Sequence, residues 1–186
     1  MNLLIVGGAH GVGKTTLLDG ARAALPAEVA FFDPGEYFWR HLYGTGDLTA
    51  AEVERLVAAE LLRLRDRPLV VSNWHYAVWT PAGWVPQLPL PLWRETIASL
   101  APAAVRLVLV EAPAEVILAR RLRDRKQRKR KLDRAAVERE LAESRRYREL
   151  FLREVSGLTD IAAVDIDNVD LAAAQRSLLS VLNRLL

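Results

Sequence analysis

The feature that most constrains this chain is the stretch from Gly8 to Thr16, which reads Gly-Ala-His-Gly-Val-Gly-Lys-Thr-Thr. It fits the phosphate-loop pattern Gly-x-x-x-x-Gly-Lys-Ser/Thr without a mismatch. Glycines let backbone N–H groups turn inward around an anion, and the N-terminus of a following helix favours negative charge. An apolar run at residues 3–6 precedes the stretch and helical composition at residues 16–25 follows it. The context therefore predicts strand, loop and helix in the order that phosphate binding requires.

This loop predicts a site for the triphosphate of ATP. Lys14 would reach the β- and γ-phosphates as a point charge, and the Thr15 hydroxyl would ligate Mg²⁺. ATP and Mg²⁺ are therefore the expected cofactors. The loop residues expected to bind ATP are Gly8, Ala9, His10, Gly11, Val12, Gly13, Lys14, Thr15 and Thr16.

The length of 186 residues suits one domain, residues 1–186, and 51% of the chain is hydrophobic, which is enough for a sizeable core. The absence of cysteine excludes a disulfide framework and a thiolate metal site, and fits a reducing compartment. No apolar run approaches the roughly 18 residues of a membrane-spanning helix, and the chain shows no signal peptide. We therefore expect a cytoplasmic protein without a membrane partner.

The positive charge is concentrated in one segment. Residues 120–134 hold ten Lys or Arg residues and two Asp residues, a local charge of +8 in a chain whose formal net charge is only +3. The rest of the chain is therefore net acidic, and an anionic partner is expected at this segment alone.

Strand and helix patterns alternate along the chain. Strands are predicted at residues 3–6, 29–32, 68–72, 105–110 and 161–166, and helices at residues 16–25, 34–43, 49–65, 92–100, from 112, 133–155 and from 170 to the end. This alternation predicts an α/β fold of the P-loop NTPase type, a five-stranded parallel sheet with helices on both faces. Residues 73–91 have neither helical nor strand periodicity and are predicted to be a long ordered loop of functional importance.

Ligands of such sheets bind beyond the carboxyl ends of the strands. The residues predicted to converge at that edge are those from Gly7 to Thr15, Asp33, Asn73, Glu111, Asp167 and Asn168.

Three stretches resemble the nucleoside monophosphate kinases, and among them the archaeal type of adenylate kinase. One is the phosphate loop. The second is His75 followed by residues 80–89, Thr-Pro-Ala-Gly-Trp-Val-Pro-Gln-Leu-Pro, which is similar to the family's Thr-Pro-x-Gly-Tyr/Trp-x-Pro-x-Leu-Pro segment. The third is Glu111 with residues 117–122 and the basic segment after them, which is similar to the family's arginine-bearing lid.

The resemblance implies transfer of the γ-phosphoryl group of MgATP to a nucleoside monophosphate, with AMP as the first choice. It implies a lid at about residues 119–134 that closes over the phosphates and excludes water. The planar guanidinium group binds phosphate oxygens bidentately, so arginines suit this task. The candidate catalytic arginines are Arg121, Arg125, Arg128, Arg130 and, on the returning helix, Arg145, beside Lys14.

The resemblance also implies a monophosphate-binding segment at about residues 33–66. Its candidates are Asp33, Gly35 and Arg40, with His75 after the third strand; Arg40 is displaced by one position from the bacterial spacing. The loop after the fifth strand lies near the adenine of ATP in relatives, which implicates Asn168.

One departure from the family concerns the metal. Relatives have Asp-x-His at the end of the third strand, where the carboxylate helps to hold water around Mg²⁺, whereas this chain has Asn73-Trp74-His75. An amide can orient a metal-bound water but adds no charge. Asp33 or Glu111 could supply the missing charge across the edge of the sheet.

Two other functions stay open from the sequence. Residues 120–134 could contact the backbone phosphates of a nucleic acid, which would make the chain a nucleic-acid-associated P-loop kinase or ATPase. The chain could also be an ATP-binding protein without turnover.

Overall fold

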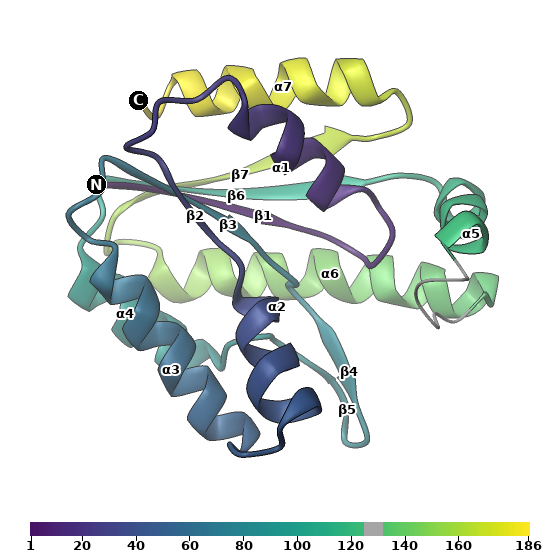
Figure 1. The fold of residues 1–186 in the computed structure, drawn as a ribbon, viewed down its shortest axis with the longest axis horizontal. Helices are drawn as coiled ribbons and strands as arrows, with labels where there is room; N and C mark the ends of the chain where they lie inside the picture. Colours follow the sequence, from purple (N-terminus) through teal and green to yellow (C-terminus); the bar gives the residue numbers. More distant parts are fainter. Residues whose placement is uncertain (125–131) are drawn as a thin grey trace.

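Five parallel strands form the central sheet (Figure 1). The computed structural model describes residues 1–124 and 132–186. The strands are β1 (Asn2–Gly7), β2 (Ala30–Phe32), β3 (Leu69–Asn73), β6 (Ala104–Glu111) and β7 (Asp160–Asp167), in the order β2-β3-β1-β6-β7. All four pairings are parallel, so the carboxyl ends of the strands lie along one edge.

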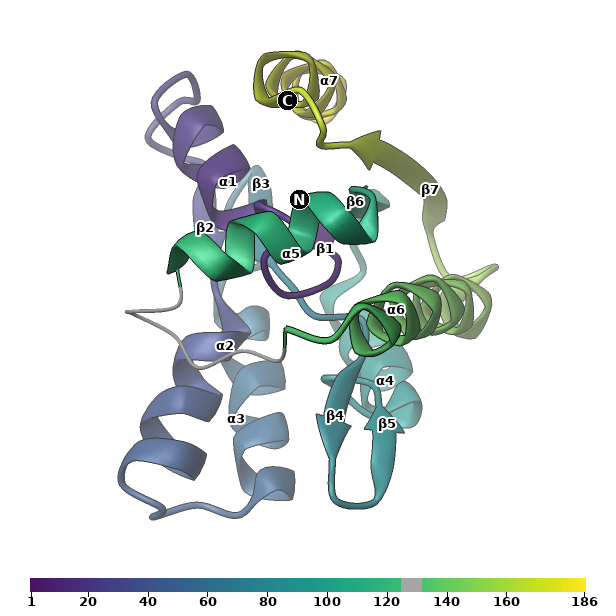
Figure 2. The same ribbon diagram turned by 90° about the vertical axis from the view of Figure 1, so that its right-hand side faces the viewer.

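Helices cover both faces of this sheet. They are α1 (Lys14–Arg22), α2 (Pro34–Tyr37), α3 (Ala50–Arg63), α4 (Leu90–Leu100), α5 (Ala114–Arg123), α6 (Arg134–Val155) and α7 (Leu171–Asn183). Helices α1 and α7 lie on one face, and α3, α4 and α6 lie on the other, as Figures 1 and 2 show. The predicted fold class is therefore confirmed, down to the number of strands and the parallel sheet.

Successive residues of the central strand β1 enter opposite halves of the core. Leu4 and Val6 belong to the apolar cluster that includes residues of α1 and α7. Leu3 and Ile5 belong to the cluster that includes residues of α3, α4 and α6. A strand covered on both faces has no polar side, which is why the sequence shows a continuous apolar run here rather than an alternation.

The boundaries of the first two helices differ from the prediction. Helix α1 begins at Lys14, two residues before the predicted start, because the chain enters it directly from the loop through Gly13. The predicted helix over residues 34–43 is an α-helix only to Tyr37 and continues as a π-helix, η1 (Phe38–Gly44). The π-helix ends with the Thr45 N–H donating to the Arg40 carbonyl at 2.9 Å, a five-residue spacing that residue periodicity does not reveal.

Residues 73–91 were predicted to be a loop, and that prediction is wrong for part of the stretch. Strands β4 (Val78–Thr80) and β5 (Gly83–Val85) pair as a small antiparallel hairpin. Gly83 has a φ of 111°, and the Thr80 hydroxyl donates to the Gly83 carbonyl at 2.9 Å, which closes the turn. Strands of three residues are too short to show a period of two.

The segment after β3 is anchored inside the sheet by Tyr76. Its hydroxyl donates to the Val108 carbonyl at 2.9 Å and lies 3.3 Å from the Ile5 carbonyl, and burial raises the pKa of the phenol well above its ordinary value.

Among the helices in the described parts of the chain, none is long and apolar enough to cross a membrane.

The ring of Tyr76 makes Gly7 irreplaceable. A Cβ atom on Gly7 would lie 2.3 Å from Tyr76 Cε2, in a ring that is buried and fixed by the hydrogen bond of its hydroxyl to Val108. We expect Gly7→Ala to lower the free energy of unfolding by about 2 kcal/mol, measured by urea denaturation.

Gly20→Ala is the matched control. Its Cβ would also lie 2.3 Å from a side-chain atom, but that atom is the Nε2 at the end of the flexible Gln175 side chain. Because alanine is the better helix former, this variant should be neutral or more stable by up to about 1 kcal/mol. Equal losses in the two variants would contradict the account.

Candidate functional site

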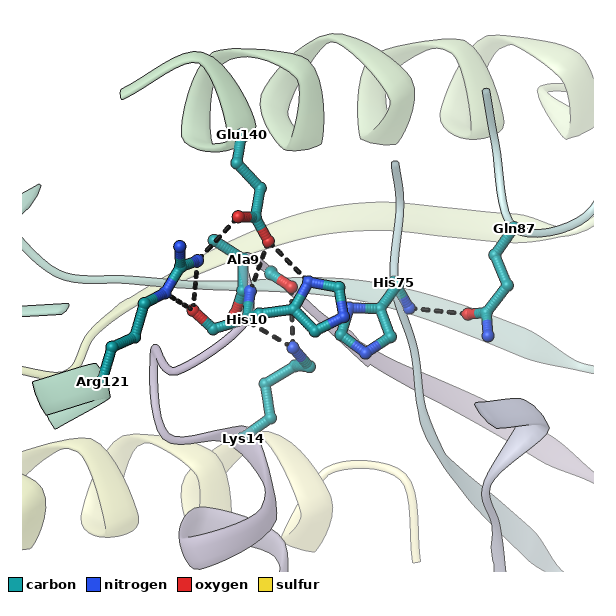
Figure 3. A network of polar contacts seen from close by, with 8 residues as sticks. Ala9, His10, Lys14, His75, Gln87, Arg121 and Glu140 are labelled. Carbon is teal, nitrogen blue, oxygen red and sulfur yellow. Dashed lines mark hydrogen bonds and ion pairs between the residues drawn. The ribbon is translucent and has the colours of Figure 1, made fainter. Parts of the chain in front are cut away.

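The carbonyl groups of the loop between β1 and α1 accept hydrogen bonds from side chains that surround the loop (Figure 3). Lys14 donates to Gly8 and Ala9, Arg121 donates to His10, and Arg120 and Asn168 donate to Val12. Side chains thus fix four carbonyl groups of the loop, and the loop leads directly into the N-terminus of α1, a position that favours a bound anion.

Lys14 is the first residue of α1, and only 6% of its surface is exposed. Its Nζ atom lies 2.7 Å from the Gly8 oxygen and 3.2 Å from the Ala9 oxygen. The ammonium group is therefore held within the loop, at the N-terminus of a helix. Both features favour a bound phosphate there.

Three elements meet at the tip of the loop, where Arg121 of α5 and Glu140 of α6 bind His10 (Figure 3). Arg121 Nη2 donates to the His10 carbonyl at 2.7 Å and to Glu140 Oε2 at 2.6 Å. Glu140 Oε1 accepts from the His10 N–H at 2.6 Å and contacts His10 Nδ1 at 2.7 Å. Because an ionised carboxylate only accepts, Nδ1 carries the proton in this contact.

The charge of Glu140 is stabilised by this network. Burial raises the pKa of its carboxyl, but the hydrogen bonds from His10 and the nearby Arg121 guanidinium outweigh burial and lower the pKa to about 2. Arg121 is 3% exposed, so the pair with Glu140 is a buried ion pair. Removing one partner of a buried ion pair strongly destabilises the fold, because the remaining charge is left buried without compensation.

His75 joins the segment after β3 to the phosphate loop. Its ring stacks on the ring of His10, with the centroids 4.0 Å apart and the planes at 18°. Its backbone N–H donates to Gln87 Oε1 at 2.7 Å, which ties it to the far side of the β4–β5 hairpin. Two residues that the sequence assigned to separate sites, His10 and His75, are therefore in contact.

Arg120 and Asn168 hold the other end of the loop. Arg120 Nη1 and Asn168 Nδ2 both donate to the Val12 carbonyl at 2.8 Å, and Arg120 Nη2 donates to the Asn168 carbonyl at 2.6 Å. A Cβ atom on Gly13 would lie 2.4 Å from Asn168 Nδ2. Glycine at this position therefore permits the contact between the loop and the chain after β7.

Asp33 and Asn73 meet where β2 and β3 end. Asn73 Nδ2 donates to Asp33 Oδ2 at 2.6 Å, and Asp33 Oδ1 accepts from the Gly35 N–H at 2.8 Å as the N-cap of α2. Asp33, Asn73 and Thr15 line the same cavity, of about 300 Å³. A hydroxyl, a carboxylate and an amide oxygen are ligands that suit Mg²⁺ together with nucleotide phosphates, so these residues fit that ion.

Arg145 lies on the α6 side of the sheet edge. Arg145 Nε pairs with Glu111 Oε1 at 2.6 Å, and both residues line a second cavity, of about 520 Å³, against α6. Arg40 is exposed on the π-helix η1. Arg125, Arg128 and Arg130 lie outside the described residues.

The sequence analysis did not identify Glu140 as a residue of the site. Glu140 lies between Val137 and Leu141 on the buried side of α6, where a charge interrupts the apolar face. A carboxylate in that position predicts a buried cationic partner. The arginines of the preceding basic segment are candidates for that partner. The link from Glu140 to the phosphate loop, however, depends on how α6 crosses the sheet edge.

Comparison with known proteins identifies similar kinases. No family model matches the chain. It is 29% identical over 120 residues to an adenylate kinase of Methanopyrus kandleri, covering 64% of this chain and 58% of the relative. It is 28% identical over 136 residues to an adenylate kinase of Thermococcus kodakarensis, covering 67% of this chain and 66% of the relative. The chain thus spans less than two thirds of the length of either relative.

Among solved structures, the shikimate kinase of Bacteroides thetaiotaomicron is similar with a TM-score of 0.56 and 17% identity, covering 97% of this chain and 98% of that one. At that identity the similarity concerns the fold alone. The chain has the fold of the P-loop kinases, and its resemblance to the nucleoside monophosphate kinases, and to the archaeal adenylate kinases among them, is confirmed.

The depressed pKa of Glu140 makes stability depend on pH. Its contribution is complete above about pH 4.5, the ordinary value, and is lost as the pH falls toward about 2. We expect Glu140→Gln to lower the free energy of unfolding at neutral pH by about 3 kcal/mol, and this difference from the parent to shrink as the pH falls below about 4.5.

Urea denaturation at a series of pH values measures this dependence. Glu143→Gln is the control on the same helix, since Glu143 forms an exposed pair with Arg146 and should matter by less than about 1 kcal/mol. If the difference in free energy of unfolding between Glu140→Gln and the parent stays constant with pH, the carboxylate charge is not the cause of the destabilisation.

Proposed function

We propose that this protein is an ATP-dependent nucleoside monophosphate kinase that transfers the γ-phosphoryl group of MgATP to AMP or a related monophosphate. The observation that carries the proposal is the stacking of His75 on His10 at 4.0 Å. It brings the segment that follows β3 against the tip of the phosphate loop, where the γ-phosphate of a bound ATP would lie. Donor and acceptor phosphates can then face each other, as in-line transfer requires.

The donor half of the mechanism rests on the loop. Its N–H groups and Lys14 would bind the β- and γ-phosphates and neutralise the charge that develops on them. Thr15 would ligate the Mg²⁺ of MgATP, which supplies charge neutralisation and orients the phosphates. Arg120 and Asn168, which contact each other at the outer side of the loop, would border the nucleoside.

We assign Arg121 a role different from that of the other candidate arginines. Because Arg121 is buried and bound to Glu140 and the His10 carbonyl, we assign it to fixing the conformation of the loop. Phosphate contact from residues 119–134, the proposed lid, would fall to Arg125, Arg128 and Arg130, and to Arg145 if it exchanges Glu111 for a phosphate. These roles stay predictions.

The acceptor would lie over the ends of β2 and β3. Asp33, Gly35 and Arg40 come from the proposed monophosphate-binding segment, residues 33–66, and His75 comes from beyond β3. Of these, Arg40 is the cation, and its exposed position leaves the guanidinium accessible to an incoming phosphate.

Incubation with ATP and a panel of nucleoside monophosphates, analysed by chromatography, tests the proposal. We expect ADP to form only when a monophosphate is present, and most rapidly with AMP. Lys14→Ala should reduce the rate by at least about 100-fold, because the charge at the transferred phosphate is lost. Phosphorylation of none of the monophosphates would refute the proposal.

The same panel should include short RNA and DNA oligonucleotides with a 5′-hydroxyl group. A kinase for nucleotides should bind them weakly at physiological salt and should not phosphorylate them. Tight binding that weakens steeply with salt would instead favour a nucleic acid as the partner of residues 120–134.

Arg40 supplies a second test, specific to the acceptor. We expect Arg40→Ala to raise the KM for AMP by about tenfold or more, since a charge-assisted hydrogen bond is lost, while the KM for ATP stays unchanged. The control is Arg63→Ala in the same segment, because Arg63 pairs with Glu60 on the exposed side of α3. Identical AMP kinetics for both variants would remove Arg40 from the site.

A further inference from the structure

The register of the sheet places Asp33 beside Asn73. Phe32, the last residue of β2, is paired with Ser72 of β3, so Asp33 follows β2 at the level of Asn73, the last residue of β3. The two side chains are joined there by the 2.6 Å hydrogen bond from Asn73 Nδ2 to Asp33 Oδ2. The carboxylate and the amide therefore form one unit at the carboxyl end of the sheet.

That hydrogen bond also fixes the orientation of the amide. Because Nδ2 must be the atom that donates to the carboxylate, the other atom is Oδ1. Asn73 Oδ1 is buried, and within the described part of the chain it accepts no hydrogen bond. A buried acceptor of this kind calls for a water molecule or a ligand.

The surroundings of the pair indicate what the ligand is. Thr15, the first hydroxyl after Lys14, lies on the wall of the same cavity as Asp33 and Asn73. Described residues 1–124 and 132–186 contain no cluster of three or more His, Cys, Asp or Glu side chains that could hold a metal by themselves. Magnesium does not need such a cluster, since it is commonly held by one or two carboxylates, water molecules and the phosphates of a nucleotide.

Asp19 and Glu36 also line this cavity, but no hydrogen bond joins either of them to Asn73 among the described residues. Glu111 ends the neighbouring strand β6, and its contacts argue against it. Its Oε1 atom pairs with Arg145 Nε at 2.6 Å, and its side chain lines the second cavity, against α6. Thr15 is absent from that cavity. Asp33 therefore remains as the carboxylate that shares a cavity with Thr15 and hydrogen-bonds to Asn73.

We propose that Asp33 provides the negative charge that holds the hydrated Mg²⁺ of MgATP, and that Asn73 positions the Asp33 carboxylate. The charge then lies at the end of β2, while the end of β3 carries the neutral Asn73. Asn73 Nδ2 orients the Asp33 carboxylate, and Asn73 Oδ1 accepts from a metal-bound water. The proposal rests on ATP binding at the loop, as the proposed function does, but not on the identity of the acceptor.

Exchanging the carboxylate of Asp33 and the amide of Asn73 tests the proposed Mg²⁺ site directly. The variants are Asp33→Asn, Asn73→Asp and the double exchange, with Asp19→Asn as the control for another carboxylate on the wall of the same cavity. The measurement is binding of a non-hydrolysable ATP analogue by calorimetry, in EDTA and over a series of Mg²⁺ concentrations. Asparagine is as good an N-cap as aspartate, so Asp33→Asn should keep α2 folded, and thermal unfolding checks this.

We expect Asp33→Asn to raise the Mg²⁺ concentration for half-maximal enhancement of binding by at least tenfold. Asn73→Asp should lower it, and the double exchange should return it to within about threefold of the parent, because the carboxylate is restored on the neighbouring strand. Asp19→Asn should change it by less than twofold. Binding in EDTA should not weaken in Asp33→Asn, because no metal is then present for the carboxylate to hold.

Three results would overturn the proposal: no effect of Asp33→Asn, no recovery in the double exchange, or an equal effect of Asp19→Asn. Each of these leaves the proposed function standing if the parent binds the analogue and phosphorylates AMP. A parent that fails to bind the analogue with or without Mg²⁺ would refute both.

Discussion

The structure depends on how the loop between β1 and α1 is held from outside. Three side chains that are distant in sequence, Arg120, Arg121 and Asn168, donate to its carbonyl groups, and Glu140 accepts from its backbone at His10. These residues come from α5, from α6 and from the chain after β7. A loop fixed in this way is ordered before any ligand arrives, so little loss of conformational entropy remains to oppose binding.

The same contacts connect the loop to the proposed lid and to the segment after β3. Arg121 lies near the end of α5, at the beginning of the proposed lid (residues 119–134), and Glu140 lies in α6, after the lid. His10 contacts Glu140 through its backbone and its ring, and it stacks on His75 from the acceptor side. One residue of the loop is thus in contact both with α6 and with the segment after β3.

The sequence sufficed for the fold because the decisive signals are local. The pattern from Gly8 to Thr16 and the apolar strands predict the sheet, and Asp33 followed by Pro34 is a local signal for the start of a helix. The hairpin β4–β5 was missed because strands of three residues carry no period. The π-helix at Phe38–Gly44 was missed because its hydrogen-bond spacing leaves no mark on composition. Glu140 and the Asp33–Asn73 pair could be placed only by contacts between distant segments.

The central claim is that an ATP site and a monophosphate site face each other across the phosphate loop. Calorimetry with two adenosines joined through five phosphates tests it most directly, since this molecule spans both sites at once. The account predicts one molecule bound per chain, with an affinity at least about 100-fold higher than that for ATP or AMP alone, because the second site is filled without a second loss of translational freedom. An affinity no higher than that for ATP would contradict the account.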